Sequence, residues 1–155
     1  MRRILLPVDG SLESLGAVNQ AILEARAPEG VEVHLINVQP RTIPEESMVA
    51  IPAEDVDTYY YRRSVAALEC AERCLHDAGV NFVSHHVVGP VAERILEKQR
   101  ELGCDSILMS THGHGRVANA LLGSVSARVM RTARVPVVLV KAREVPDFTG
   151  RLGAT

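Results

Sequence analysis

The chain has few aromatic side chains, only 3% of its 155 residues, and it contains no tryptophan. Its core must therefore be built from aliphatic residues and methionine. Neither sign of charge predominates, because 17 Lys and Arg stand against 19 Asp and Glu and give a formal net charge of −2. Nucleic-acid-binding proteins typically carry an excess of basic residues, which this composition does not have, so we expect no nucleic-acid partner.

Long apolar runs are also absent. No stretch approaches the roughly 20 apolar residues that a membrane-spanning helix needs, and the short apolar run near the N-terminus is too short for a secretory signal. Three cysteines, Cys70, Cys74 and Cys104, are an odd number, which favours reduced thiols over a disulfide framework. We therefore expect a cytoplasmic protein that does not contact a membrane. The length predicts one domain, residues 1–141, followed by a C-terminal tail, residues 142–155.

Short apolar segments alternate along the chain with longer stretches of helical periodicity, which is the pattern of βαβ units around a parallel sheet. We expect strands at residues 4–8, 31–38, 81–88, 106–110 and 135–140, a proline-interrupted loop at 39–52 and a last helix at 123–133. The helix after the loop is expected to bury a stripe formed by Tyr61, Val65, Leu68, Ala71 and Leu75. Because crossovers between parallel strands are right-handed, these elements predict an α/β fold: a five-stranded parallel sheet in a doubly wound three-layer α/β/α sandwich.

The segment after the fourth expected strand, STHGHGRVANALLGSVS, combines three glycines with several small hydroxyl residues. In open α/β sheets, ligands bind beyond the carboxyl ends of the strands, where the strand order reverses. Glycine allows backbone N–H groups to approach an anion. Ser124 and Ser126 fall in the first turn of the next helix, where free N–H groups favour phosphate. The same features also fit a flexible connecting loop, and no lysine follows the glycines as in a Walker A loop.

Three segments, PVDGS, MSTHGHG and LLGSVSARV leading to VPVVLV, resemble the universal stress protein family. The resemblance covers nearly the whole chain and includes the order of elements, so we expect the strand order 3-2-1-4-5. The family's nucleotide motif is a glycine, two residues, a glycine, nine residues, and a glycine followed by Ser or Thr. Gly113, Gly123 and Ser124 match it, whereas Ser110 stands at the first glycine position.

The resemblance implies a site for an adenine nucleotide, ATP in the first place. Pro7 and Met109 are then expected beside the base, and Val38 is expected to offer backbone groups to it. Asp9 is expected near the phosphates, where it would hold Mg²⁺ through the nucleotide. The full set of expected nucleotide-binding residues is Pro7, Val8, Asp9, Val38, Met109, Ser110, His112, Gly113, Gly115, Gly123, Ser124, Val125 and Ser126.

The last expected strand is apolar and contains Pro136, which lacks the N–H that a ladder requires and so places the strand at a sheet edge. An exposed apolar edge is a template for pairing with another chain, and family members commonly pair this strand across a two-fold axis. We therefore expect a homodimer through Val135, Val137, Val138, Leu139 and Val140.

The expected function is that of a homodimeric stress-response sensor or regulator that binds an adenine nucleotide. Members that lack the complete motif include some that do not bind ATP, so Ser110 leaves open a protein that acts through protein contacts alone. A slow ATPase is the other alternative, although the sequence shows no triad or paired carboxylates for catalysis. Whether the protein is an enzyme therefore remains open at this point.

Other residues with chemical potential also fit structural roles. Asp9 suits a helix cap or a turn as well as a ligand contact. His85 and His86 are adjacent on an expected strand, so they point to opposite faces and do not chelate one ion. Cys70 and Cys74 lie four residues apart on an expected helix and fit ordinary thiols on a side face of that helix.

Overall fold

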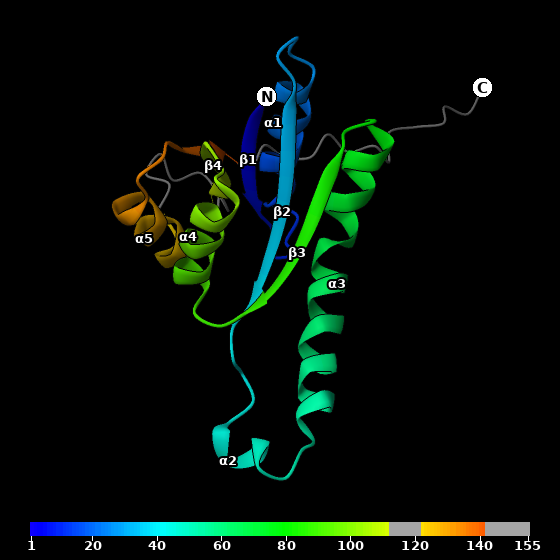
Figure 1. Cartoon of the computed structure of the whole chain (residues 1–155), viewed down its shortest axis with the longest axis vertical. Coiled ribbons are helices and arrows are strands. Elements are labelled where there is room, and N and C mark those ends of the chain that lie inside the picture. The colour runs from blue at the N-terminus through cyan, green and yellow to red at the C-terminus, as the bar shows by residue number, and fades with distance from the viewer. Residues whose placement is uncertain (112–121, 142–155) are drawn as a thin grey trace, which may run out of the picture.

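The computed structural model describes residues 1–111 and 122–141. A five-stranded parallel sheet runs through this part of the chain in the order β3-β2-β1-β4-β5 (Figure 1). Its strands are β1 (Arg2–Pro7), β2 (Val31–Gln39), β3 (Phe82–Val88), β4 (Ser106–Thr111) and β5 (Val137–Lys141). The predicted fold class and strand order are confirmed.

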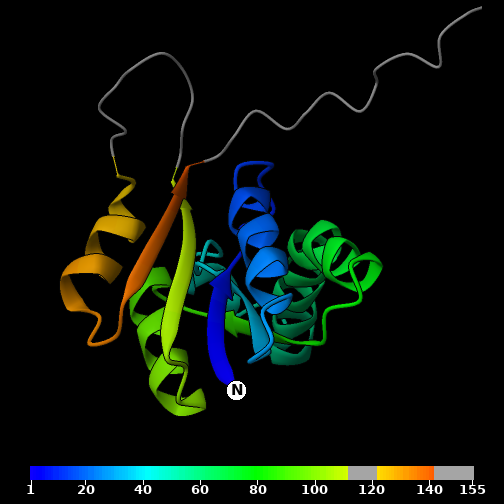
Figure 2. The same cartoon turned by 90° about the horizontal axis from the view of Figure 1, so that it is seen from above.

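The helices form the two outer layers. They are α1 (Leu15–Ala25), the short α2 (Glu45–Met48), α3 (Ala53–Asp77), α4 (Val91–Leu102) and α5 (Ser124–Thr132). Viewed from above, α1 and α3 cover one face of the sheet, and α4 and α5 cover the other (Figure 2). No helix within residues 1–111 and 122–141 has the length and apolar character needed to cross a bilayer.

The central strand β1 is buried on both faces, as its continuous apolar sequence predicts. Ile4 and Leu6 point into the core beneath α1 and α3, whereas Leu5 points into the core beneath α4. All three side chains are at most 1% exposed. Burial on both faces is what an interior strand requires, and β1 lies between β2 and β4 in the middle of the sheet.

The long helix α3 corrects one prediction. Leu68, Ala71 and Leu75 are buried as expected, but Tyr61 is 56% exposed and Val65 is 42% exposed. The predicted stripe was wrong in this half of the helix, where each buried position lies one residue earlier in the sequence.

Tyr60 and Ser64 occupy those positions and are buried. The Ser64 hydroxyl lies 2.7 Å from Nδ1 of His86 on β3. The Tyr60 hydroxyl accepts hydrogen bonds from the N–H groups of Thr42 and Ile43. The backbone bond from Ile43 is the main cause that lowers the pKa of Tyr60. Polar groups with partners therefore complete the buried face of α3.

The strand boundaries and those of the last helix differ from the expected ones by at most two residues. The segment predicted as a loop contains α2, a single helical turn that lies at the end of α3 farthest from the other helices (Figure 1). Proline and glycine mark boundaries as expected: Pro90 directly precedes α4, and Gly103 ends it with a left-handed φ of 62°.

Candidate functional site

A cavity of about 380 Å³ lies at the carboxyl ends of β1, β2 and β4. Because β1 pairs with β2 on one side and with β4 on the other, this is the point where the strand order reverses and where doubly wound sheets bind ligands. Its volume lies within the range of small-molecule sites. The cavity is lined by Pro7, Val8, Asp9, Ser11, Glu13, Ser14, Ile36, Asn37, Val38, Gln39, Pro40, Arg63, Val91, Ile95, Met109, Ser110, Val125 and Ser126.

The structure brings many of the predicted nucleotide-binding residues together around this cavity. Those that line it are Pro7, Val8, Asp9, Val38, Met109, Ser110, Val125 and Ser126. Gly123 and Ser124 stand at the start of α5, outside the lining. His112, Gly113 and Gly115 lie outside the described residues.

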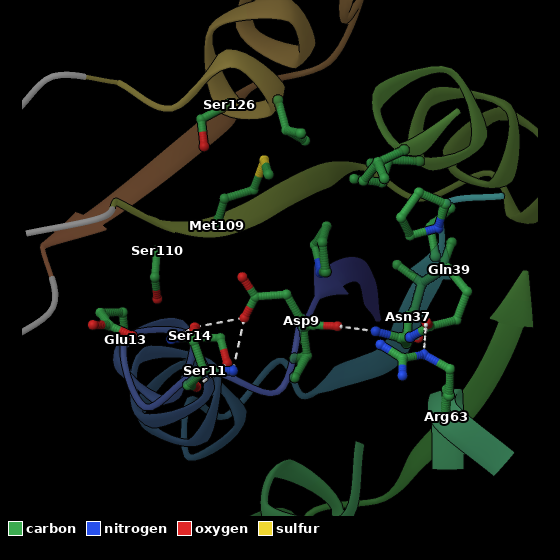
Figure 3. A pocket seen from close by; sticks show the side chains of 18 residues that line it. Asp9, Ser11, Glu13, Ser14, Asn37, Gln39, Arg63, Met109, Ser110 and Ser126 are labelled. Carbon is green, nitrogen blue, oxygen red and sulfur yellow. Dashed lines mark hydrogen bonds between the residues drawn. The ribbon is translucent and has the colours of Figure 1, made fainter. Parts of the chain in front are cut away.

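Asp9 follows β1 and combines the two roles that its sequence position suggests. Its Oδ1 accepts hydrogen bonds from the N–H and the hydroxyl of Ser11, at 2.9 and 2.5 Å. These bonds shape the turn into α1, which Gly10 allows by adopting a φ of 87°. The same carboxylate lines the cavity, where it lies between two groups of polar side chains (Figure 3).

Ser110 shows how the chain accommodates a serine at the family's glycine position. Ser110 belongs to β4, so its backbone is extended and requires no glycine. Its Oγ accepts a hydrogen bond of 2.8 Å from the N–H of Ala17 in the first turn of α1. The first-turn N–H groups of a helix lack partners within the helix, so the added hydroxyl supplies one from the neighbouring strand.

The N-terminus of α5 faces the cavity at another side. Gly123 is its N-cap and has no side chain with which to cap the helix, and no acidic residue lies in the first turn. Val125 and Ser126 from this turn line the cavity. Free N–H groups and the positive end of the helix dipole make such a terminus suitable for a phosphate group.

Three lining residues form a polar group that sequence reasoning missed. Asn37 and Gln39 of β2 and Arg63 of α3 lie together at one end of the cavity (Figure 3). Two polar residues flank Val38 at the carboxyl end of β2, where both are buried, and this pattern was a usable signal in the sequence. Arg63 gives no comparable signal, because only the fold brings α3 beside the end of β2.

The two histidines of β3 and the three cysteines do not line the cavity. His85 and His86 project to opposite faces of β3: Nε2 of His85 lies 3.0 Å from Nδ1 of His34, and His86 contacts Ser64. Burial is the main cause that lowers the pKa of His85. Within residues 1–111 and 122–141, no three histidine, cysteine or acidic side chains are grouped to hold a metal ion.

The fold and the cavity define a doubly wound α/β protein with a cavity at its topological switch point. The sequence model of the Universal stress protein family matches residues 1–141. The chain belongs to that family.

Individual relatives agree with this assignment. Universal stress protein MJ0531 of Methanocaldococcus jannaschii is 30% identical over 146 residues, which cover 90% of this chain and 82% of the relative. The solved structure of protein MJ0577 superposes with a TM-score of 0.75 at 26% identity and covers 93% of this chain and 98% of that one. A family member from Arabidopsis thaliana, solved with AMP bound, has a TM-score of 0.66 at 17% identity and covers 92% and 93% of the two chains.

Proposed function

We propose that this protein binds an adenine nucleotide, with ATP as the preferred ligand, and acts as a regulator in the stress response. The observation that carries this proposal is the cavity at the switch point, which combines aliphatic walls with the N-terminus of α5. Val38, Val91, Ile95 and Met109 supply apolar surface against which a purine packs. Such a mainly apolar hollow with a few polar groups is typical of small-molecule sites.

The phosphates are assigned to the α5 end of the cavity. Val125 and Ser126 contribute first-turn N–H groups there, and no acidic side chain of the turn opposes an anion. Asp9 supplies a carboxylate next to this space, and Ser11 and Ser14 add hydroxyl oxygens. Mg²⁺ prefers oxygen ligands and is commonly held by one or two carboxylates together with substrate phosphates. These residues therefore fit a Mg²⁺ ion that arrives with the nucleotide.

The AMP-bound relative from Arabidopsis thaliana supports an adenine nucleotide as the ligand class, because it shares the fold that builds the cavity. The proposed setting is the cytoplasm, which agrees with Cys70, Cys74 and Cys104 being free thiols.

The first test identifies nucleotide released from freshly purified protein by denaturation, followed by titration with ATP and Mg²⁺. We expect binding at millimolar affinity or better, which corresponds to a free energy of about −4 kcal/mol or more favourable. If no nucleotide is released and ATP does not bind, the alternative that acts through protein contacts alone replaces this proposal.

A charge variant then locates the phosphates. Ser124→Asp places a negative charge in the first turn of α5, where it favours the helix but repels phosphate. We expect ATP affinity to fall about tenfold and AMP affinity to fall less, because the repulsion grows with phosphate charge. Cys70→Asp makes the same charge change on an exposed part of α3 and serves as the control. Equal ATP affinity in the two variants would contradict the assignment of phosphates to α5.

The proposed regulator is a homodimer that pairs through β5. This strand is a sheet edge, and Val138 on it is 42% exposed. The proposed seam comprises Val135, Val137, Val138, Leu139 and Val140. Since α5 leads directly into β5, a ligand at the start of α5 and a partner on β5 contact neighbouring parts of one segment.

The dimer is tested by placing a charge on each edge of the sheet. Val138→Lys is expected to give a monomer by gel filtration with light scattering, because an inserted lysine prevents edge pairing. Val83→Lys on β3, the opposite edge, is the matched control, since Val83 is 48% exposed. A Val138→Lys protein that remains dimeric would exclude β5 as the seam.

A further inference from the structure

The polar residues at the β2 end of the cavity form a chain of hydrogen bonds with a single direction. Nε of Arg63 donates to Oε1 of Gln39 at 3.2 Å, and Nε2 of Gln39 donates to Oδ1 of Asn37 at 2.8 Å. Nδ2 of Asn37 then donates to the backbone carbonyl of Val8 at 2.8 Å. Each amide is thus oriented by its neighbour, and the chain is anchored on the residue that follows β1.

This arrangement engages the side-chain acceptors of both amides and leaves donors for a ligand. Oδ1 of Asn37 and Oε1 of Gln39 each accept a bond within the chain. Arg63 carries only donors, and its two terminal nitrogens lie beyond the Nε that Gln39 holds. This end of the cavity therefore suits a ligand atom that accepts hydrogen bonds.

Arg63 is held from the solvent side as well. Its guanidinium carbon lies 5.6 Å from the centre of the Tyr59 ring, within the range of a cation–π contact. Although the side chain of Arg63 is exposed overall, Gln39 is only 9% exposed. A buried amide on one side and an aromatic ring on the other thus place the guanidinium at the cavity wall.

Resting on the proposed function, we infer that Arg63 binds the base of the nucleotide by donating a hydrogen bond to a purine ring nitrogen. With the phosphates at the N-terminus of α5, the base extends toward β2, where Val38 and Gln39 line the cavity. Ring nitrogens of adenine are acceptors, so they complement the donors of Arg63. Gln39 and Asn37 act as positioning residues through Arg63.

The test measures affinities for AMP and ATP by calorimetry in the wild type, in Arg63→Ala and in Arg62→Ala. Arg62 is the matched control, because it is the neighbouring exposed arginine and does not line this cavity. We expect Arg63→Ala to weaken AMP and ATP by the same factor, about tenfold, as for the loss of one hydrogen bond from a charged donor. Arg62→Ala is expected to keep wild-type affinity for both.

Two further measurements identify the atoms. Among AMP analogues that each lack one ring nitrogen, one is expected to bind the wild type about tenfold more weakly than AMP does. The affinity for this analogue is expected to be the same in Arg63→Ala as in the wild type. Gln39→Met is expected to weaken AMP binding in the wild type but not in the Arg63→Ala background, because Gln39 acts by orienting Arg63.

The other outcomes overturn the inference. If Arg63→Ala weakens the binding of ATP but not of AMP, Arg63 contacts the phosphates. If Arg63→Ala keeps wild-type affinity for both nucleotides, Arg63 is not part of the site, although the protein still binds nucleotide. Equal affinity of the wild type for all ring-nitrogen analogues likewise excludes the base contact. A wild-type protein that binds neither AMP nor ATP refutes the proposed function, and the base contact with it.

Discussion

Ser110 provides the sharpest test of how this chain accommodates a residue other than the motif glycine. Its hydroxyl accepts the hydrogen bond from the N–H of Ala17, a residue with no exposed surface in the first turn of α1. Ser110→Ala removes this acceptor and leaves the rest of the side chain unchanged. Ser110→Gly restores the family residue and also removes the acceptor. Ser110→Thr keeps a hydroxyl at the same position and is the conservative control.

The magnitude follows from the contact. Loss of a side-chain acceptor at a helix N-terminus costs about 0.5–2 kcal/mol. Because the variant leaves the N–H of Ala17 without its acceptor, we expect a loss of about 1 kcal/mol for Ser110→Ala. Glycine within a strand adds about 0.5–1 kcal/mol, which makes Ser110→Gly the least stable of the three variants.

Urea unfolding without nucleotide measures these differences. With a urea dependence of about 2 kcal/mol per molar, Ser110→Ala lowers the unfolding midpoint by about 0.5 M and Ser110→Gly by about 0.8–1 M. Ser110→Thr is expected to remain near the wild type. Equal midpoints for the wild type and Ser110→Ala would refute the reasoning, because the hydroxyl would then contribute nothing to α1.

Three further predictions concern the surroundings of the site and the sheet. Gly10→Ala is expected to lower stability by about 2–3 kcal/mol in thermal unfolding, since its φ is +87° and the added carbon would stand 3.1 Å from a backbone atom of α3. Gly79→Ala, with a φ of +71° and open space around it, should lose only the backbone part, about 1 kcal/mol; equal losses would show that packing against α3 is unimportant. Burial lowers the pKa of His85, so the folded protein binds a proton there less readily than the unfolded chain. Stability is therefore expected to fall as the pH drops below 6.5, the ordinary value, with a smaller fall in His85→Gln when urea midpoints are compared; parallel profiles would contradict this cause. Burial also raises the pKa of Cys104 to about 11, so a thiol reagent at neutral pH should modify exposed Cys70 in the native protein and Cys104 only after unfolding; mass spectrometry of the modified protein would detect the reverse order.

The order of elements was readable from the sequence because each strand and helix leaves a strong local pattern. Three consecutive apolar residues in β1 are typical of a strand whose two faces are both buried, and β1 is such an interior strand. The same reasoning failed in α3, where Tyr60 and Ser64 are buried in place of Tyr61 and Val65. Residue type predicted the wrong positions because partners such as His86, which satisfy buried polar groups, come from distant parts of the chain.

The candidate site was predictable where it follows a strand end or a glycine motif. Asp9, Val38 and Met109 were expected at the site from their places in segments that resemble the family, and they line the cavity. Arg63 was not predictable, since helical periodicity places it on an exposed face of α3 and says nothing of the strand that it meets.

By itself, the sequence determined the α/β class of fold, because this depends on local hydrophobic patterns and on the handedness of crossovers. Its resemblance to the family supplied the strand order, and the general rule for open α/β sheets indicated the edge at which to look for a cavity. Only the tertiary structure decided which side chains close the cavity. It placed the Ser110 hydroxyl where it accepts a hydrogen bond from α1, and it placed Arg63 where it donates one to Gln39. Hydrogen bonds between residues far apart in the chain depend on distances of a few ångströms in space, which no local pattern encodes.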